Sequence, residues 1–194
     1  MKKSNYIINA FTLPEIILSL MIIGVIAVVM LQVLVPNVRK VETRAKINAA
    51  HALISRAIIQ YQAEHLCSGS LASCDEFIYE NIDIEEIYDT IFADKFKLEK
   101  HCGNLIGLGC FSKDGYLYND GTTFSNPDDN EEYYKVRLQN GIAIAFYART
   151  PKCEDNVCMN VIIDTNGPAA PNIVNRDLFT GVVTTNLVKF DNEE

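Results

Sequence analysis

An apolar run near the N-terminus is the feature that most constrains how this chain can fold. The 25 residues from Phe11 to Val35 contain one charged side chain, that of Glu15. At about 1.5 Å of rise per residue, a helix of this length crosses a hydrocarbon core of about 30 Å. A carboxylate within such a helix costs about 2.5 to 3.5 kcal/mol on insertion scales, so Glu15 needs a positively charged partner. The sequence predicts a membrane-spanning helix with a paired acid near its start.

The residues around Glu15 form a motif. A short basic leader, Met1 to Ala10, ends in a small residue, and Phe11-Thr12-Leu13-Pro14-Glu15 and the apolar run follow it. This arrangement resembles the class III signal of type IV prepilins and type II secretion pseudopilins. The resemblance implies that a prepilin peptidase cuts between Ala10 and Phe11 and methylates the new amino terminus of Phe11. It also implies that Glu15 neutralises the Phe11 amine of a neighbouring subunit as a filament assembles.

Two positions depart from the commonest pattern of that family. Ala10 stands where glycine is usual, and Pro14 stands where many pilins carry an aliphatic residue. Alanine is still small, and Pro14 falls in the first helical turn, where a missing N–H costs little.

The alternative interpretation of this N-terminal segment is an ordinary signal anchor or a secretory signal cut elsewhere. A secretory signal carries its small-residue cleavage site after the apolar core, whereas Ala10 precedes it.

The whole chain is expected to divide into four segments. We expect a leader (1–10), a transmembrane or filament-core helix (11–35), an amphipathic continuation of that helix (36–65) and one extracytoplasmic globular head (66–194). Pro36 is expected to kink or loosen the helix. Beyond it, apolar residues recur at helical spacing, which predicts one buried face. These residues are Ile47, Ala50, Ile54, Ala57, Ile58 and Tyr61.

Charge separates the helix from the head. Residues 1–60 hold seven Lys and Arg against two Asp and Glu, and residues 61–194 hold ten against twenty-three. An acidic head disfavours nucleic acid as a partner, because contacts of basic residues with phosphates supply most of the affinity for nucleic acid.

The basic residues near the span bear on its orientation. Two precede the span and four follow it, and because basic residues favour the cytoplasmic side, this count alone would place the head in the cytoplasm. They are Lys2 and Lys3, then Arg39, Lys40, Arg44 and Lys46.

The cysteines favour the opposite orientation. All six lie beyond the span, in three local pairs: Cys67 with Cys74, Cys102 with Cys110, and Cys153 with Cys158. Even number and close spacing favour three small disulfide loops in an oxidising compartment, although six cysteines allow fifteen connectivities. The alternative is a metal site with His101 beside Cys102 as a ligand. The absence of a C-x-x-C pair disfavours it.

The head is predicted to be α+β, with the helix packed on a small antiparallel sheet. Asp83 is expected to begin a short amphipathic helix, and the polar stretch of residues 119–132 predicts an exposed loop. Tyr133 to Gln139 and Ile142 to Ala148 are expected to form a hairpin across a two-residue Asn140-Gly141 turn. A further strand is expected from Val157 to Ile163.

A second motif lies near the C-terminus. The stretch from Asp164-Thr165-Asn166-Gly167 through Pro171-Asn172 to Asp177-Leu178-Phe179 is similar to the ending of a group of type II secretion-like pilin proteins. Asp164, Asn166 and Asp177 carry oxygen atoms that could bind calcium, and no other cofactor is expected. The stretch does not fit the twelve-residue calcium loop, and the favoured alternative is that these side chains bond their own turn backbone.

The sequence therefore predicts a structural subunit of a type IV pilus-like filament or a type II secretion pseudopilus. The expected partners are prepilin peptidase, other pilin subunits and an inner-membrane assembly platform. The protein would be held in the bacterial inner membrane with its head outside the cytoplasm, and then enter a filament. Alternatives are a membrane-anchored binding or adhesion protein and a signal-anchored enzyme. No catalytic signature is present in the sequence, so we expect no enzyme.

Overall fold

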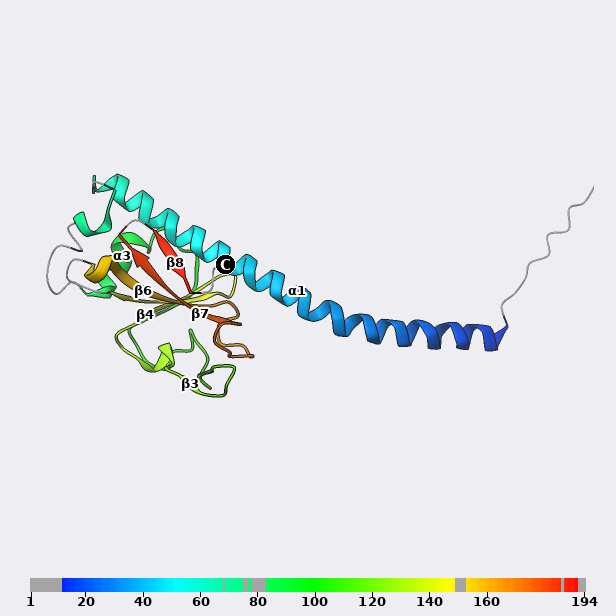
Figure 1. Ribbon diagram of the computed structural model, residues 1–194. Coiled ribbons are helices and arrows are strands. Elements are labelled where there is room, and N and C mark those ends of the chain that lie inside the picture. The colour runs from blue at the N-terminus through cyan, green and yellow to red at the C-terminus, as the bar shows by residue number, and fades with distance from the viewer. Residues whose placement is uncertain are drawn as a thin grey trace, which may run out of the picture. The chain divides into compact units, whose positions relative to one another are not determined.

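The computed structural model describes residues 12–67, 69–74, 77, 83–148, 153–185 and 187–191. The chain divides into two compact units, Met1–Glu42 and Thr43–Glu194. Helix α1, Leu13–Glu64, contributes to both units (Figure 1). It continues through Pro36, so this proline does not end the helix.

The first unit is an apolar helical segment. Large apolar side chains along α1 are exposed, from Leu13 at 73% to Val41 at 70%. The most apolar 18-residue window of α1 has a mean hydropathy of 2.9. By length and composition, α1 is long and apolar enough to cross a membrane. This agrees with the expectation of a spanning segment.

The second unit is built on an antiparallel sheet. The described strands have the order β1-β4-β5-β6-β7-β8, so that every strand from β4 onward pairs with the next in the chain. Their bounds are β1 Leu98–Gly103, β4 Tyr134–Leu138, β5 Ala143–Ala148, β6 Val157–Asp164, β7 Leu178–Thr184 and β8 Val188–Phe190. A two-stranded ribbon, β2 Tyr116–Leu117 with β3 Thr123–Phe124, lies outside this sheet. The expected combination of a long helix with a small antiparallel sheet is confirmed.

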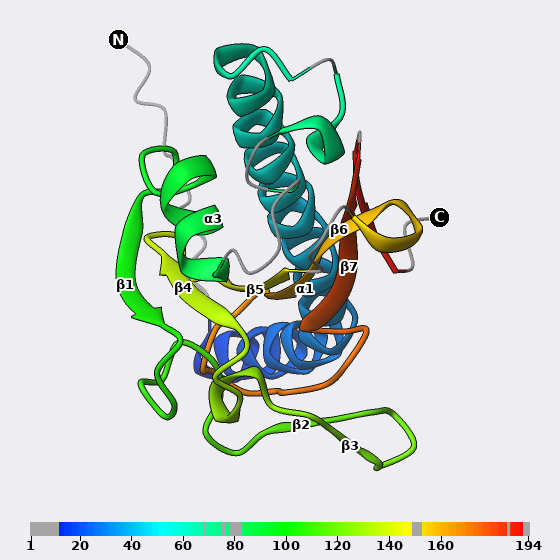
Figure 2. The ribbon, with the colours of Figure 1, turned by 90° about the vertical axis from the view of Figure 1, so that its left-hand side faces the viewer.

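One face of the sheet packs against helices. The expected stripe on α1 is buried or half-buried: Ala50, Ile54, Ala57, Ile58 and Tyr61 are at most 2% exposed, with Ile47 half-buried beside them. They share a core with alternate sheet residues such as Ile144 and Phe146. Helix α3, Ile84–Ile91, covers part of the same core. Figure 2 shows α1 and α3 beside the strands.

The other face of the sheet packs against loops. The residues that alternate with the first core, Ala143 and Ala145 on β5 and Ile162 on β6, belong to a second buried cluster. The rest of this cluster comes from the segments around the ribbon, including Phe111 and Tyr116. The period-two alternation of the strands therefore serves two cores, one made with helices and one with loops.

Helix α3 begins as the sequence predicts. The Asp83 carboxylate accepts a hydrogen bond from the Glu85 N–H at 3.3 Å, which is an N-cap. Four residues on one side of α3 are buried: Ile84, Ile87, Tyr88 and Ile91. Because the turn of the helix is 3.6 residues, this spacing places all four toward the core.

The hairpin between β4 and β5 differs from the expectation. Leu138 pairs with Ile142, and three residues, not two, connect the strands. The Gly141 N–H donates to the Leu138 carbonyl at 2.9 Å, and Gly141 has a φ of 83°. Only the glycine takes the left-handed conformation, which is typical of a three-residue hairpin loop. The two-residue turn was wrong because Asn140 keeps a negative φ.

Gly181 gives a test of the β7–β8 pairing. It lies opposite Phe190, and a β-carbon at this position would overlap the Phe190 ring and the Lys189 carbonyl. We expect Gly181→Ala to push β8 away and to lower the free energy of unfolding by about 1 to 3 kcal/mol. Thermal unfolding followed by the near-ultraviolet circular dichroism of the tyrosines would measure this. Val182→Ala, a half-buried position on the same strand, is the control, and equal midpoints for the two variants would contradict the expected overlap.

Candidate functional site

Glu15 lies in the first turn of α1 and binds the start of its own helix. Its carboxylate accepts hydrogen bonds from the Thr12 N–H and from the Thr12 hydroxyl, each at 3.1 Å. A glutamate three residues after a threonine N-cap, bonded to the backbone of that threonine, forms half of a capping box. The spacing Thr12-x-x-Glu15 is the sequence signal that could have predicted this contact.

The surroundings of Glu15 are apolar and exposed. Leu13, Ile16 and Ile17 are exposed by 73%, 46% and 54%. The Ser19 hydroxyl donates to the Glu15 carbonyl at 2.8 Å, so it is used within the helix. The carboxylate is thus the charged group of an otherwise apolar surface, and it can accept further hydrogen bonds from a cation. Ala10 and Phe11, the expected cleavage and methylation site, lie outside the described residues.

The cysteines pair as the local spacing predicts. Disulfides join Cys67 to Cys74, Cys102 to Cys110 and Cys153 to Cys158. The alternative of a cysteine metal site with His101 is therefore wrong, because Cys102 has no free thiolate. His101 instead contacts the Tyr134 hydroxyl through its Nε2 atom.

The C-terminal motif is centred on a buried acid. Asp164, at the end of β6, is completely buried and accepts a hydrogen bond from the Tyr116 hydroxyl. Its other oxygen accepts the Asn166 N–H at 3.0 Å. Burial raises the pKa of Asp164 to about 7, and the nearby Asp177 adds to this shift. Burial and the proximity of Asp164 raise the pKa of Tyr116 as well.

The remaining two residues of that motif bond their own loop. The Asp177 carboxylate accepts from the Ile173 N–H at 3.3 Å, and the Asn166 amide donates to the Ala169 carbonyl. The Asn166 Oδ1 atom is buried without a hydrogen-bond partner. Within the described ranges, no group of three or more His, Cys, Asp or Glu could hold a metal ion. The local hydrogen bonds match the favoured interpretation, and calcium binding stays the less favoured alternative.

Asp128 is a structural residue that the sequence did not reveal. The stretch 119–132 was expected to be an exposed loop, yet Asn126, Pro127 and Asp128 are buried. The Asp128 carboxylate accepts the Gly109 N–H at 3.0 Å, and its backbone carbonyl accepts the Gly107 N–H at 3.0 Å. The exposed-loop prediction is therefore wrong here, because Asp128 anchors the Cys102–Cys110 loop. Sequence polarity gave no signal of this burial.

A buried lysine lies in the same region. Lys135 on β4 is fully buried, and its ammonium group donates to the carbonyl oxygens of Asn130 at 2.7 Å and Asn104 at 3.4 Å. Burial lowers its pKa, and the charge of Asp128 opposes that shift. These contacts bind the Asn104 loop to the end of the 119–132 stretch. They form a structural support for both loops.

The raised pKa of Asp164 predicts a pH-dependent stability. An unfolded aspartate titrates near a pKa of about 3.9, so the folded protein holds a proton between about pH 4 and 7 that the unfolded chain releases. The contribution of Asp164 to the free energy of unfolding should therefore fall as pH rises through this window. We expect the thermal midpoint of Asp164→Asn to rise relative to wild type from pH 4.5 to 7.5.

Asp120 provides the matched control. It is exposed, and hydrogen bonds from Thr122 lower its pKa. The stability that Asp120 contributes is lost only as pH falls below about 4, so the thermal midpoint of Asp120→Asn should stay parallel to that of wild type between pH 4.5 and 7.5. Parallel pH profiles for wild type and Asp164→Asn would contradict a raised pKa of Asp164.

Comparisons of the chain with protein-family models, with curated proteins and with solved structures find no match.

Proposed function

We propose that this protein is a pilin-like structural subunit of a type IV pilus-like filament or a type II secretion pseudopilus. Prepilin peptidase would remove the leader after Ala10 and methylate Phe11. The apolar part of α1 would hold the subunit in the inner membrane until an assembly platform extracts it. Other subunits would then replace lipid as the surroundings of this helix.

The observation that carries the proposal is the position of Glu15. A single carboxylate lies in the first turn of a helix whose large apolar side chains are exposed. Its hydrogen bonds come from Thr12, a neutral partner at the start of the same helix. A charged amine from a neighbouring chain is a stronger partner, because it adds the attraction of opposite charges, which apolar surroundings screen less than water does. Assembly would therefore give Glu15 a positively charged partner in place of the neutral Thr12.

The head supports the proposal in a second way. Three disulfides are typical of proteins exposed to an oxidising compartment, which agrees with a head outside the cytoplasm. The stripe of α1 from Ala50 to Tyr61 packs into the core of the head. A helix that is apolar all round in its first half and buried on one side in its second half suits a subunit with a filament stalk and a folded head.

Two substitutions separate the charge of Glu15 from its capping contact. Glu15→Gln keeps an oxygen that can accept from the Thr12 N–H but removes the charge, and Thr12→Val removes the hydroxyl donor but keeps the charge. We expect Glu15→Gln to be processed normally and to enter filaments about tenfold less, because it loses a charged hydrogen bond. Thr12→Val should assemble like wild type. The amount of subunit in sheared filaments, relative to the membrane fraction, is the measurement.

Normal incorporation of Glu15→Gln would overturn the assembly role of this residue. The mass of the mature amino terminus, with and without an active prepilin peptidase, checks the processing step. A start at methylated Phe11 that depends on the peptidase is expected. An uncut chain in the presence of a working peptidase would instead indicate a permanently anchored protein.

A further inference from the structure

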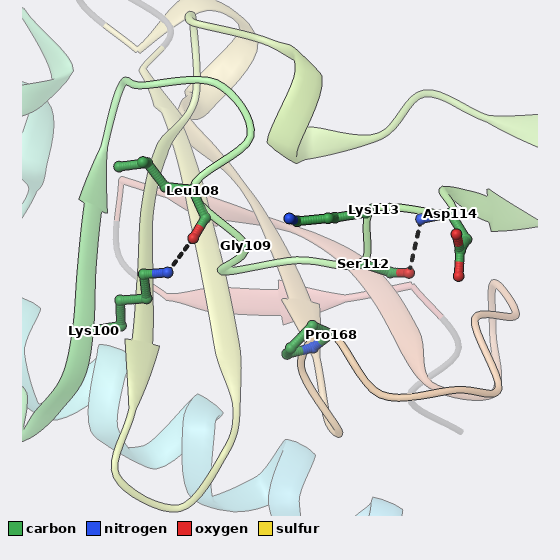
Figure 3. Close-up of a pocket in the computed structure, with 7 residues that line it drawn as sticks. All are labelled: Lys100, Leu108, Gly109, Ser112, Lys113, Asp114 and Pro168. Atoms are coloured by element: carbon green, nitrogen blue, oxygen red, sulfur yellow. Dashed lines mark hydrogen bonds between the residues drawn. The ribbon is translucent and has the colours of Figure 1, made fainter.

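A pocket of about 500 Å³ opens where three segments of the head meet. Its walls come from β1, from the Cys102–Cys110 loop and the turn that follows it, and from the loop after β6 (Figure 3). This volume lies in the range of small-molecule sites, about 300 to 1,000 Å³. The expected roles of the chain do not use this pocket.

Two lysines face each other across the pocket. Lys100 extends from β1, and Lys113 extends back from the turn, so that their side chains approach Gly109 from two sides (Figure 3). The Lys100 Nζ and the Lys113 Cε each lie 3.9 Å from the point that a β-carbon on Gly109 would occupy. Glycine at this position therefore leaves open the space between the two charged groups.

Neither lysine is neutralised within the described residues. The Lys100 ammonium donates to the Leu108 carbonyl, an uncharged partner, and Lys113 makes no hydrogen bond or ion pair there. Asp114 also lines the pocket, but its carboxylate points away from the two ammonium groups (Figure 3). The pocket thus concentrates positive charge in a head that is acidic as a whole.

The walls of the pocket are fixed by hydrogen bonds. The Gly109 N–H donates to Asp128, and the Gly109 carbonyl accepts from Arg137 at 3.1 Å. Arg137 is held in turn by a two-bond ion pair with Glu99, at 3.0 and 3.1 Å. A site whose backbone is held in place before binding loses less entropy when a ligand arrives.

Ser112 connects the pocket to the buried Tyr116 and Asp164 side chains. It is 1% exposed, and its hydroxyl accepts from the Asn172 amide at 2.7 Å and from the Asp114 N–H at 3.2 Å. Its carbonyl accepts from Asn126 at 2.9 Å, and its N–H donates to the Tyr116 hydroxyl at 3.1 Å. With all of its polar groups bonded inside the head, Ser112 sets the direction in which the Lys113 turn leaves the core.

Apolar side chains border the charged part of the pocket. Leu108 and Pro168 line it, and Leu108 is 37% exposed. Leu105 and Ile106, on the same disulfide-closed loop, are exposed by 65% and 50%. A ligand that fits this arrangement carries a negative group for the lysines and an apolar group for the rim.

We propose that this pocket binds an oxyanion, a carboxylate or a phosphate, that is attached to an apolar group. Lys100 and Lys113 hold the anion on both sides of Gly109, and Leu108 with Pro168 contacts the apolar part. This binding site goes beyond the filament role, and it does not depend on Phe11 or Glu15.

The test is a titration of the full-length protein in detergent micelles, followed by the amide NMR signals of Gly107 and Gly109. The probes are butyrate, its neutral analogue butyramide, and inorganic phosphate. We expect saturable shifts with butyrate or with phosphate and none with butyramide. Tighter binding of butyrate would assign the site to a carboxylate with an apolar chain, and tighter binding of phosphate would assign it to a phosphoryl group.

Variants locate the binding. Lys113→Gln and Lys100→Gln should each weaken the anion about tenfold, because each removes one charged hydrogen bond. Lys113→Arg should keep the affinity within about twofold of wild type, since the charge is preserved. Lys189→Gln, which removes an exposed charge from β8, is the control for non-specific attraction. Equal shifts with butyramide, or unchanged affinity in Lys113→Gln, would overturn the proposal.

Discussion

The packing of one stripe of α1 against the sheet is the interaction on which the head depends. Ile54, Ala57 and Tyr61 are almost completely buried there, among the inward residues of β4 to β8. The contact extends to the last strand, because the His51 Nε2 lies 3.1 Å from the Val188 carbonyl. Without this helix, the part of that sheet face that α3 does not cover would be exposed to water. The head therefore includes the second half of α1 as a core element.

The opposite face of the sheet is covered in a different way. No α-helix packs on it among the described residues, and the β2–β3 ribbon with the loops beside it supplies Tyr116, Phe111 and Val174 to a small core. Loops have few regular backbone hydrogen bonds of their own, so buried polar groups hold them. Asp128 and Asp164 do this by accepting hydrogen bonds from neighbouring segments. The loops are thereby fixed closely enough to form a defined pocket.

Periodicity explains which parts of this fold are visible in the sequence. The stripe from Ala50 to Tyr61, the Asp83 cap and strand β6 are local patterns, because each depends on residues a few positions apart. The cysteine pairs were visible for the same reason. The burial of Asp128 was not, because its partners Gly107 and Gly109 lie about twenty positions away and only the fold brings them together. The lysine pair at Gly109 was hidden likewise, since Lys100 and Lys113 come from opposite sides of a disulfide loop.

The spacing of the three disulfides limits what each bond can hold together. Each bond joins cysteines only five to eight positions apart, so it closes a short local loop and does not connect distant strands. Closing such a loop stabilises the fold by about 2 to 3 kcal/mol per bond, because it lowers the chain entropy of the unfolded state. The order of the strands therefore rests on their own hydrogen bonds and on the two cores. Reduction of a disulfide frees its own loop first, and for Cys102–Cys110 that loop borders the pocket.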